Sequence, residues 1–385
     1  MRILIAPDKF KDALDAAAVA AALAAGVRDA IPDARITCCP LGDGGEGTGR
    51  VLAAARDAKP HACPVLDPLG RPRTATWWLD EPRGAGIVEM AEASGLWLLA
   101  PPERDARRTT SFGTGQLIRA AIEAGCRELV LCVGGSATVD GGAGCLQALG
   151  WRIVWRGDDV AHASGGVLDR AVAIEPPDDV GVLRGVGLSI LCDVNNPLLG
   201  PQGAAAVFAP QKGATPAQVA RLEKNLDHWA ELLERATGLD ARDLPGAGAA
   251  GGLPAGLAAA FGARLVGGFD EVARQVQLRR RIAQADLVLT GEGRLDEQTA
   301  GGKVVAGVGA LATQAGRPVI ALVGAVPEAE RSGLARRLGL REIVVITPPA
   351  TPREQALCRC AVNLRSAAAR TVARFGSDRS KEARK

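Results

Sequence analysis

Short apolar runs alternate with longer stretches rich in Ala and Leu along most of this chain, and this alternation restricts the fold more than any other feature. Near the start, an apolar run at residues 2–6 is followed by helical spacing over residues 14–30 and by a second run at 35–39. Similar runs occur late in the chain, at residues 286–290, 318–323 and 342–346. Each late run is followed by Gly or Pro and then by a helical pattern. This order predicts an α/β protein with a parallel sheet.

The middle of the chain has a different pattern. Residues 74–79 and 86–90 are apolar runs on either side of a turn-forming segment, which predicts an antiparallel hairpin. Further strands are expected at residues 128–133, 151–155 and 188–192, and a capped helix at 215–235.

These patterns predict two α/β domains. Residues 1–65 plus 285–375 form a discontinuous domain of Rossmann- or flavodoxin-like type, a three-layer doubly wound parallel sheet built from both ends of the chain. Residues 66–284 form an inserted second domain of mixed α/β structure. The polar residues 376–385 are expected to be a frayed tail.

Composition argues against several classes of protein. The 385 residues carry 46 Lys and Arg against 43 Asp and Glu, a net charge of +3 that is too balanced for a nucleic-acid-binding surface. Aromatic residues make up 3% and Tyr is absent, which argues against stacking on single strands. No apolar stretch reaches membrane-spanning length, and the start does not resemble a signal peptide. The nine Cys lack CxxC spacing, so we expect reduced thiols, no zinc and a cytoplasmic location.

Glycine is concentrated in polar clusters that directly follow predicted strands. Residues 42–47 formally match GxGxxG, but they include Asp43 and Glu46, whose charges repel a pyrophosphate unless a divalent cation intervenes. Residues 134–142 are a stronger candidate, because a strand-to-helix turn rich in Gly, Ser and Thr presents N–H and hydroxyl groups to phosphate. A tight turn with helix caps is the alternative. No segment matches GxxxxGK[ST], which excludes a P-loop NTPase.

Charged residues suited to phosphate chemistry lie in the same loops. The chain has eight Lys and thirty-eight Arg, yet four lysines occur in Pro- and Gly-rich polar loops: Lys9, Lys11, Lys212 and Lys303. Asp193 ends a predicted strand, where ligands collect in α/β sheets, although an Asx turn before Pro197 is the alternative. Similar positions are occupied by Asp8, Asp43, Asp140 and Asp296. Together these residues predict a phosphoryl-transfer site.

In their order along the chain, these motifs resemble those of the bacterial glycerate kinases of type I. The matching blocks are APDKFK at 6–11, GDGGEGT at 42–48, EMAEASGL at 89–96, TSFGTG at 110–115, GGSAT at 134–138 with DGG at 140–142, CDVNNP at 192–197, VF at 207–208 with PQKG at 210–213, PGAGAAGG at 245–252, and GEGR at 291–294 with Asp296. The chain departs from the family pattern at Val139, where Asn is usual, and at Asp12, Asp15, Gly301 and Gly302.

The resemblance implies an ATP- and Mg²⁺-dependent kinase that phosphorylates D-glycerate, with its active site between two α/β domains. It favours 2-phosphoglycerate as the product, in organic acid (glyoxylate) metabolism, by a monomer or homodimer that binds neither nucleic acid nor membrane. The alternatives are a 3-phosphoglycerate product, a kinase for a related small hydroxy acid, and a non-catalytic binding protein with the same fold.

The expected site residues fall into four roles. Catalysis is assigned to Asp193, Lys212 and Asp8; substrate binding to Lys9, Lys11, Arg294 and Asp296; nucleotide binding to Gly134, Gly135, Ser136, Thr138, Asp140, Gly291 and Glu292; and metal binding to Asp43 and Asp140.

Overall fold

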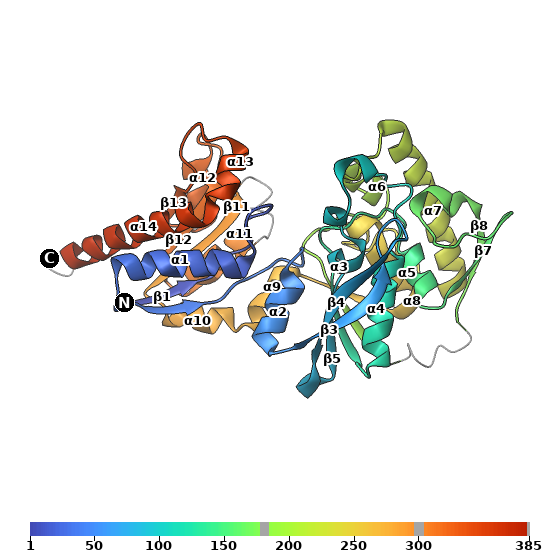
Figure 1. Ribbon diagram of the computed structural model, residues 1–385, viewed down its shortest axis with the longest axis horizontal. Coiled ribbons are helices and arrows are strands. Elements are labelled where there is room, and N and C mark those ends of the chain that lie inside the picture. Colours follow the sequence, from blue (N-terminus) through green and yellow to red (C-terminus); the bar gives the residue numbers. More distant parts are fainter. Residues whose placement is uncertain (178–184, 296–303, 383–385) are drawn as a thin grey trace. The chain divides into compact units, whose positions relative to one another are not determined.

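The chain forms two compact units, each with its own hydrophobic core (Figure 1). The computed structural model describes residues 1–177, 185–295 and 304–382, with the side chains of the last helix described as far as residue 378. Unit 1 comprises Met1–Asp43 and Phe269–Lys385, and unit 2 comprises Gly44–Gly268. The division falls at residues 43 and 268 rather than at the predicted 65 and 285, because the segment after residue 43 packs with the strands of unit 2.

Unit 1 alternates strands with helices. Its elements are β1 (Arg2–Ile5), α1 (Ala16–Ala30), β2 (Arg35–Cys38), α9 (Gly268–Gln275, whose first residue belongs to unit 2), α10 (Leu278–Gln284), β11 (Leu287–Arg294), α11 (Val304–Gln314), β12 (Val319–Ala325), α12 (Arg331–Arg337), β13 (Glu342–Val345), α13 (Arg353–Cys358) and α14 (Cys360–Glu382).

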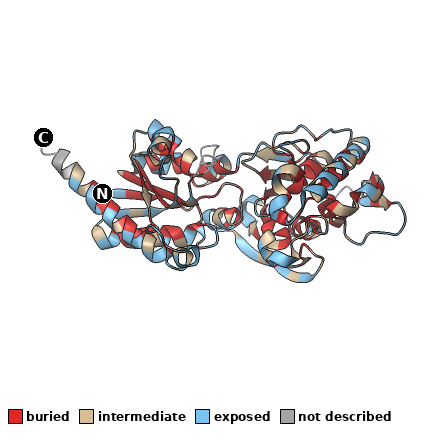
Figure 2. Cartoon of the chain, turned by 90° about the horizontal axis from the view of Figure 1, so that it is seen from above, coloured by how far each residue is buried: buried red, intermediate tan, exposed pale blue. Residues whose placement is uncertain are grey.

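The sheet of unit 1 is parallel throughout, in the order β13-β12-β11-β1-β2. Counted along this unit the order is 2-1-3-4-5, the flavodoxin-like doubly wound arrangement, and the winding reverses between β1 and β11. One face of the strands, including Ile3, Leu289 and Leu322, packs in one core with α1 and α14. The strands of this sheet are largely buried (Figure 2). Their alternate residues face the other side, where α10 and α11 lie against the strands. The predicted doubly wound sheet built from both ends of the chain is confirmed.

Unit 2 does not alternate strands and helices regularly, because several of its strands follow one another directly along the chain. Its elements are α2 (Thr48–Arg56), β3 (Lys59–Leu66), β4 (Pro72–Asp80), β5 (Ala85–Glu89), α3 (Ala91–Ser94), α4 (Phe112–Glu123), β6 (Glu128–Cys132), α5 (Ala143–Ala148), β7 (Arg152–Trp155), β8 (Ala171–Glu175), β9 (Gly187–Leu191), α6 (Ala204–Phe208), α7 (Pro216–Thr237), α8 (Leu253–Phe261) and β10 (Arg264–Val266).

The main sheet of unit 2 is mixed, in the order β10-β9-β6-β5-β4-β3. Strands β5, β6, β9 and β10 are parallel, while β3, β4 and β5 pair antiparallel. The predicted hairpin is therefore confirmed as β4–β5. The parallel strands place four carboxyl ends at one edge of the sheet, which is where ligands bind in α/β folds.

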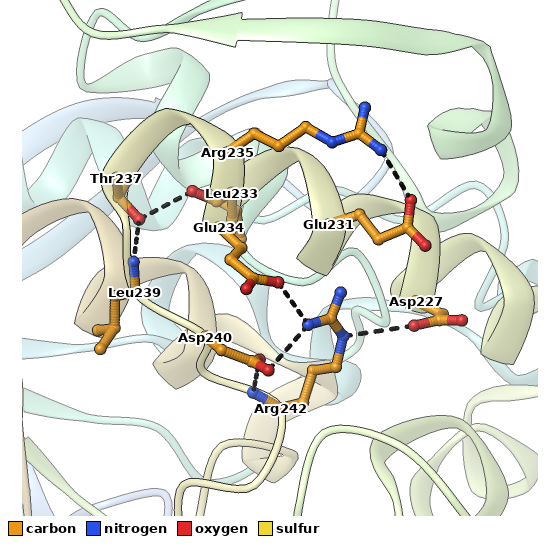
Figure 3. A network of polar contacts seen from close by, with 9 residues as sticks. All are labelled: Asp227, Glu231, Leu233, Glu234, Arg235, Thr237, Leu239, Asp240 and Arg242. Atoms are coloured by element: carbon orange, nitrogen blue, oxygen red, sulfur yellow. Dashed lines mark hydrogen bonds and ion pairs between the residues drawn. The ribbon is translucent and has the colours of Figure 1, made fainter.

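Helix α7 is capped at its start and is followed by a network of ion pairs after its end, so the predicted capped helix is confirmed. Thr215 and Gln218 form a reciprocal capping box at its start. After its end, the Arg242 guanidinium lies between three carboxylates (Figure 3), at 3.4 Å from Asp227, 2.8 Å from Glu234 and 2.9 Å from Asp240. The Arg242 carbonyl accepts a hydrogen bond from the N–H of Leu198. This network therefore also fixes a segment that follows β9.

The expected frayed tail is wrong as far as the chain is described, because α14 continues to Glu382. Phe375 is buried against the core of unit 1, and its ring lies 5.5 Å from the Arg341 guanidinium carbon. One glycine, Gly376, costs a helix only about 1 kcal/mol and does not end it. Among the described helices, none combines the length and apolar character needed to cross a bilayer.

Candidate active site

Two glycine-rich loops of unit 2 touch through their main chains at the carboxyl edge of the parallel strands. The N–H of Gly134, after β6, donates to the carbonyl of Gly44 at 3.1 Å. A Cβ atom at position 134 would lie 2.3 Å from the Cα of Gly45, and one at position 44 would lie 2.6 Å from the carbonyl oxygen of Leu191. Only glycine permits such approaches. The loops at 44–47 and 134–136 and the end of β9 therefore form one cluster, which we call the glycine-loop site.

The loop after β6 exposes only its tip. Gly135 is exposed and Gly134 half-buried, and Ser136 retains 7% of its surface. Thr138 is fully buried, and its hydroxyl donates to the carbonyl of Ala250. The accessible part of the loop is therefore its tip at residues 134–136, and the nucleotide-binding role of Thr138 stays a prediction. Val139, where Asn is usual in the family, is a fully buried core residue.

Asp140 organises the loop from within. It is fully buried, and its carboxylate accepts hydrogen bonds from the N–H and the hydroxyl of Ser111, both at 2.8 Å, and from the N–H of Gly142 at 3.2 Å. Burial raises the pKa of Asp140, and these hydrogen bonds lower it in part. The carboxylate is thus enclosed by donors of the chain itself, and its binding of metal or nucleotide stays a prediction.

Lys212 lies beneath the loop tip. The short 3₁₀ turn Pro210–Lys212 brings it there, and the side chain is 1% exposed. Its Nζ donates to the Ser136 hydroxyl at 2.8 Å and to the Thr138 carbonyl at 2.7 Å. Desolvation lowers the pKa of Lys212 to about 7, although the charge of Asp140 raises it in part. The buried amine of Lys212 therefore supports the loop tip. Because the Ser136 oxygen accepts from Lys212, the Ser136 hydroxyl proton remains available to donate to another group.

Glu89 is a site residue that the sequence reasoning missed. It is buried at the end of β5, where its carboxylate accepts the N–H of Gly47 at 2.5 Å and the N–H of Gly49 at 3.2 Å. The start of α2 is thus occupied by a carboxylate of the chain itself, so residues 42–47 are not a pyrophosphate-binding fingerprint. The available signal was an acidic residue directly after an apolar strand, in the EMAEASGL block.

Asp193 is positioned by the neighbouring strand. It follows β9, is half-buried, and accepts the N–H of Gly268 at 2.5 Å through Oδ1. Gly268 lies two residues after β10, so the bond joins the carboxyl ends of two parallel strands. This contact fixes the orientation of the carboxylate at the edge where the glycine-loop site lies.

The other predicted residues that the structure describes lie in unit 1, most of them after β1 or on β11, the two strands between which the winding of its sheet reverses. Asp8 is 8% exposed; its N–H donates to the Gly291 carbonyl at 2.9 Å, and its Oδ1 accepts the N–H of Lys9 at 2.7 Å. Glu292 is 6% exposed, whereas Arg294 at the end of β11 is exposed. Lys11 is exposed and Asp43 half-buried. Asp296 and Lys303 lie outside the described residues.

Comparisons with known proteins agree with this architecture. The model of the glycerate kinase family matches residues 3–376. The chain belongs to the glycerate kinase family. Curated relatives include the glycerate 2-kinase of Escherichia coli K12, 42% identical over 85% of this chain and 86% of that protein, and the glycerate kinase of Bacillus subtilis 168, 41% identical over 92% and 93%.

A solved structure has the same fold. The protein named "putative glycerate kinase 2" from Salmonella typhimurium LT2 is 40% identical, with a TM-score of 0.82 over 99% of both chains. Membership of the glycerate kinase family makes this chain a kinase, an enzyme that uses ATP on a small-molecule substrate. The rival interpretation as a non-catalytic binding protein is therefore not retained.

Proposed function

We propose that the chain phosphorylates D-glycerate at its 2-hydroxyl, using ATP and Mg²⁺, to give 2-phosphoglycerate. The observation that carries the proposal is the glycine-loop site, where an exposed loop tip, a buried lysine and an oriented aspartate come together at the carboxyl edge of one sheet. The choice of the 2-position is supported by the E. coli relative, which is named a glycerate 2-kinase. We also propose a cytoplasmic enzyme of organic acid metabolism that acts as a monomer or homodimer.

The tip formed by residues 134–136 suits the phosphates of ATP. The tip is accessible at Gly135, and Ser136 has a hydroxyl proton to donate because Lys212 donates to its oxygen. The protonated form of Lys212 adds positive charge directly behind the tip, which favours a phosphate group. Gly291 and Glu292 in unit 1 stay proposed nucleotide contacts.

A carboxylate suited to Mg²⁺ lies beside the same tip. Oε2 of Glu46 lies 3.3 Å from where a Cβ atom at position 135 would be. Magnesium bound with a nucleotide uses one or two carboxylates together with phosphate oxygens, so a larger protein cluster is not required. Glu46 fits this requirement, and Asp43 stays a proposed ligand. Bound there, Mg²⁺ would neutralise charge on the phosphate oxygens.

Asp193 is the proposed base. The γ-phosphoryl group passes from ATP to the 2-hydroxyl oxygen of glycerate, the hydroxyl proton passes to the Asp193 carboxylate, and ADP leaves. Its bond to Gly268 holds the carboxylate in place before substrate binds. For the substrate carboxylate we propose Lys9, Lys11 and Arg294, with Asp296 as a further contact and Asp8 as a second catalytic carboxylate.

Phosphorus NMR tests the reaction and its position together. Purified enzyme is incubated with D-glycerate, ATP and Mg²⁺, and we expect a new phosphomonoester signal identical to authentic 2-phosphoglycerate. A 3-phosphoglycerate signal would correct the position, and turnover of only another hydroxy acid in a parallel panel would correct the substrate. Intact ATP with folded enzyme across the whole panel would contradict the proposal.

Asp193→Asn tests the base within the same assay. The substitution preserves the side-chain shape and the acceptor for Gly268, but removes the proton-accepting charge. We expect kcat to fall by about 10²–10⁴-fold, the usual contribution of a general base, with little change in ATP binding. A folded variant with near-normal kcat would remove Asp193 from this role.

A further inference from the structure

One tryptophan of this chain differs sharply from the other five. Trp97 is 54% exposed, whereas the remaining tryptophans are each 9% exposed or less. Single exposed apolar side chains are common on protein surfaces, so the exposure of Trp97 bears on function only together with what fixes the ring and what its segment is attached to.

The indole of Trp97 is held in a fixed orientation. Its Nε1 donates to the carbonyl of Ala91 at 2.9 Å, and the Arg73 guanidinium carbon lies 5.4 Å from the ring centroid. A Cβ atom at position 95 would lie 2.8 Å from Nε1, so the ring folds back over a residue that must be glycine. An aromatic ring fixed before binding loses little entropy when a second ring stacks on it.

The segment that carries Trp97 is bonded to the tip of the glycine-loop site. The N–H of Leu96 donates to the Gly135 carbonyl at 2.8 Å, and the N–H of Ala137 donates to the Ser94 carbonyl at 2.9 Å. These two bonds pair Gly95 with Ser136 as an antiparallel bridge. The exposed ring is therefore attached directly beside the proposed phosphate-binding residues, without being one of them.

We propose that Trp97 is the stacking platform for the purine base of the nucleoside triphosphate. In a nucleotide the ribose separates the base from the phosphates, so the base contacts residues next to the phosphate loop rather than in it. An aromatic face suits any nucleobase, and the cationic Arg73 beside the indole adds a cation–π contact to the same stack. The proposal rests on the phosphate-binding role proposed for residues 134–136.

Fluorescence offers a selective test because the other tryptophans are buried. We expect MgADP to quench the fluorescence of the wild type and to protect it from acrylamide, while inorganic tripolyphosphate, which lacks a base, does neither. Trp97→Ala should raise the Kd for ADP by about 10- to 100-fold, the range for loss of a stacking aromatic, and leave the Kd for tripolyphosphate unchanged. Trp97→Phe should restore most of the affinity. Leu239→Ala, another exposed apolar truncation, is the matched control and should change neither Kd.

Three results would overturn the inference. First, Trp97→Ala could bind ADP as tightly as the wild type. Second, it could lose affinity for ADP and tripolyphosphate equally, which would show that the residue supports the loop instead of contacting the base. Alternatively, it could convert a dimer to a monomer in sedimentation at unchanged ADP affinity, which would make the indole a contact with a second copy. If the wild type forms phosphomonoester while Trp97→Ala binds ADP normally, only this inference fails. If the wild type neither binds ADP nor forms product, the proposed function fails as well.

Discussion

At the scale of single residues, Lys212 is the most unusual group in the glycine-loop site. It is a fully buried amine that donates hydrogen bonds to a hydroxyl and a carbonyl rather than to a carboxylate. Burial without a direct ion pair penalises the charged form, which is why the pKa of Lys212 falls from 10.5 to about 7. The charge behind the loop tip consequently changes within the range of physiological pH.

This pKa predicts how stability depends on pH. Between pH 7 and about 10.5, Lys212 is neutral in the folded state but protonated in the unfolded state, so unfolding takes up a proton. Raising the pH through this window therefore stabilises the folded wild type relative to Lys212→Met, with a slope approaching about 1.4 kcal/mol per pH unit. Urea unfolding of both proteins from pH 7 to 10 measures the difference. Lys224→Met, at an exposed lysine of α7, is the control, and equal slopes for Lys212→Met and the wild type would contradict the prediction.

At the scale of elements, the start of α2 depends on a residue from another strand. The N-cap residue of α2, Gly47, has no side chain that could accept a hydrogen bond from the first N–H groups of the helix. The carboxylate of Glu89, at the end of β5, accepts from the N–H groups of Gly47 and Gly49 instead. Glu89→Gln keeps the shape but removes the charge that complements the helix dipole, and we expect a loss of about 1–3 kcal/mol in the free energy of unfolding.

The matched control for Glu89 is Glu92→Gln on α3. Glu92 contacts the exposed guanidinium of Arg50 at 3.3 Å, and such a surface pair contributes at most about 1 kcal/mol. Denaturant unfolding of both variants gives the comparison. An equal loss for the two would show that the charge of Glu89 does not stabilise the α2 start.

The same elements show what the sequence could and could not predict. The β4–β5 hairpin and the capping of α7 depend on neighbours in the sequence, and both were predicted. Strand β3 was missed because it lies at the sheet edge and contains Pro60 and Pro64, which central strands do not tolerate. Glu89 was missed as a site residue because its partners lie about forty residues away in the sequence, beyond any local pattern. The buried position of Asp140 likewise depends on Ser111, which lies on a different loop.

At the scale of the whole molecule, the two units differ in how their cores are assembled. The core of unit 2 is drawn from one continuous segment, residues 44–268. In unit 1, β1 lies between β2 and β11, so its central pairing joins residues that are 284 apart in sequence, such as Ile3 and Leu287. Neither terminal segment alone can therefore form the sheet.

We accordingly predict that the fragment 44–268 folds by itself and that the fragment 269–385 does not. The fragment 269–385 lacks β1, β2 and α1, so Leu289, Ile320 and the inner face of α14 lose their packing partners. Burial of these apolar surfaces is the main contribution to the stability of unit 1, and the fragment loses it. Far-UV circular dichroism followed through a thermal melt measures the outcome, with a cooperative transition expected for 44–268 alone. Mixing 269–385 with the separate segment 1–43 should restore a cooperative transition, because together they contain every strand of the unit 1 sheet. A cooperative melt of 269–385 alone would show that β1 is dispensable, and failure of 44–268 to melt cooperatively would show that its core depends on unit 1.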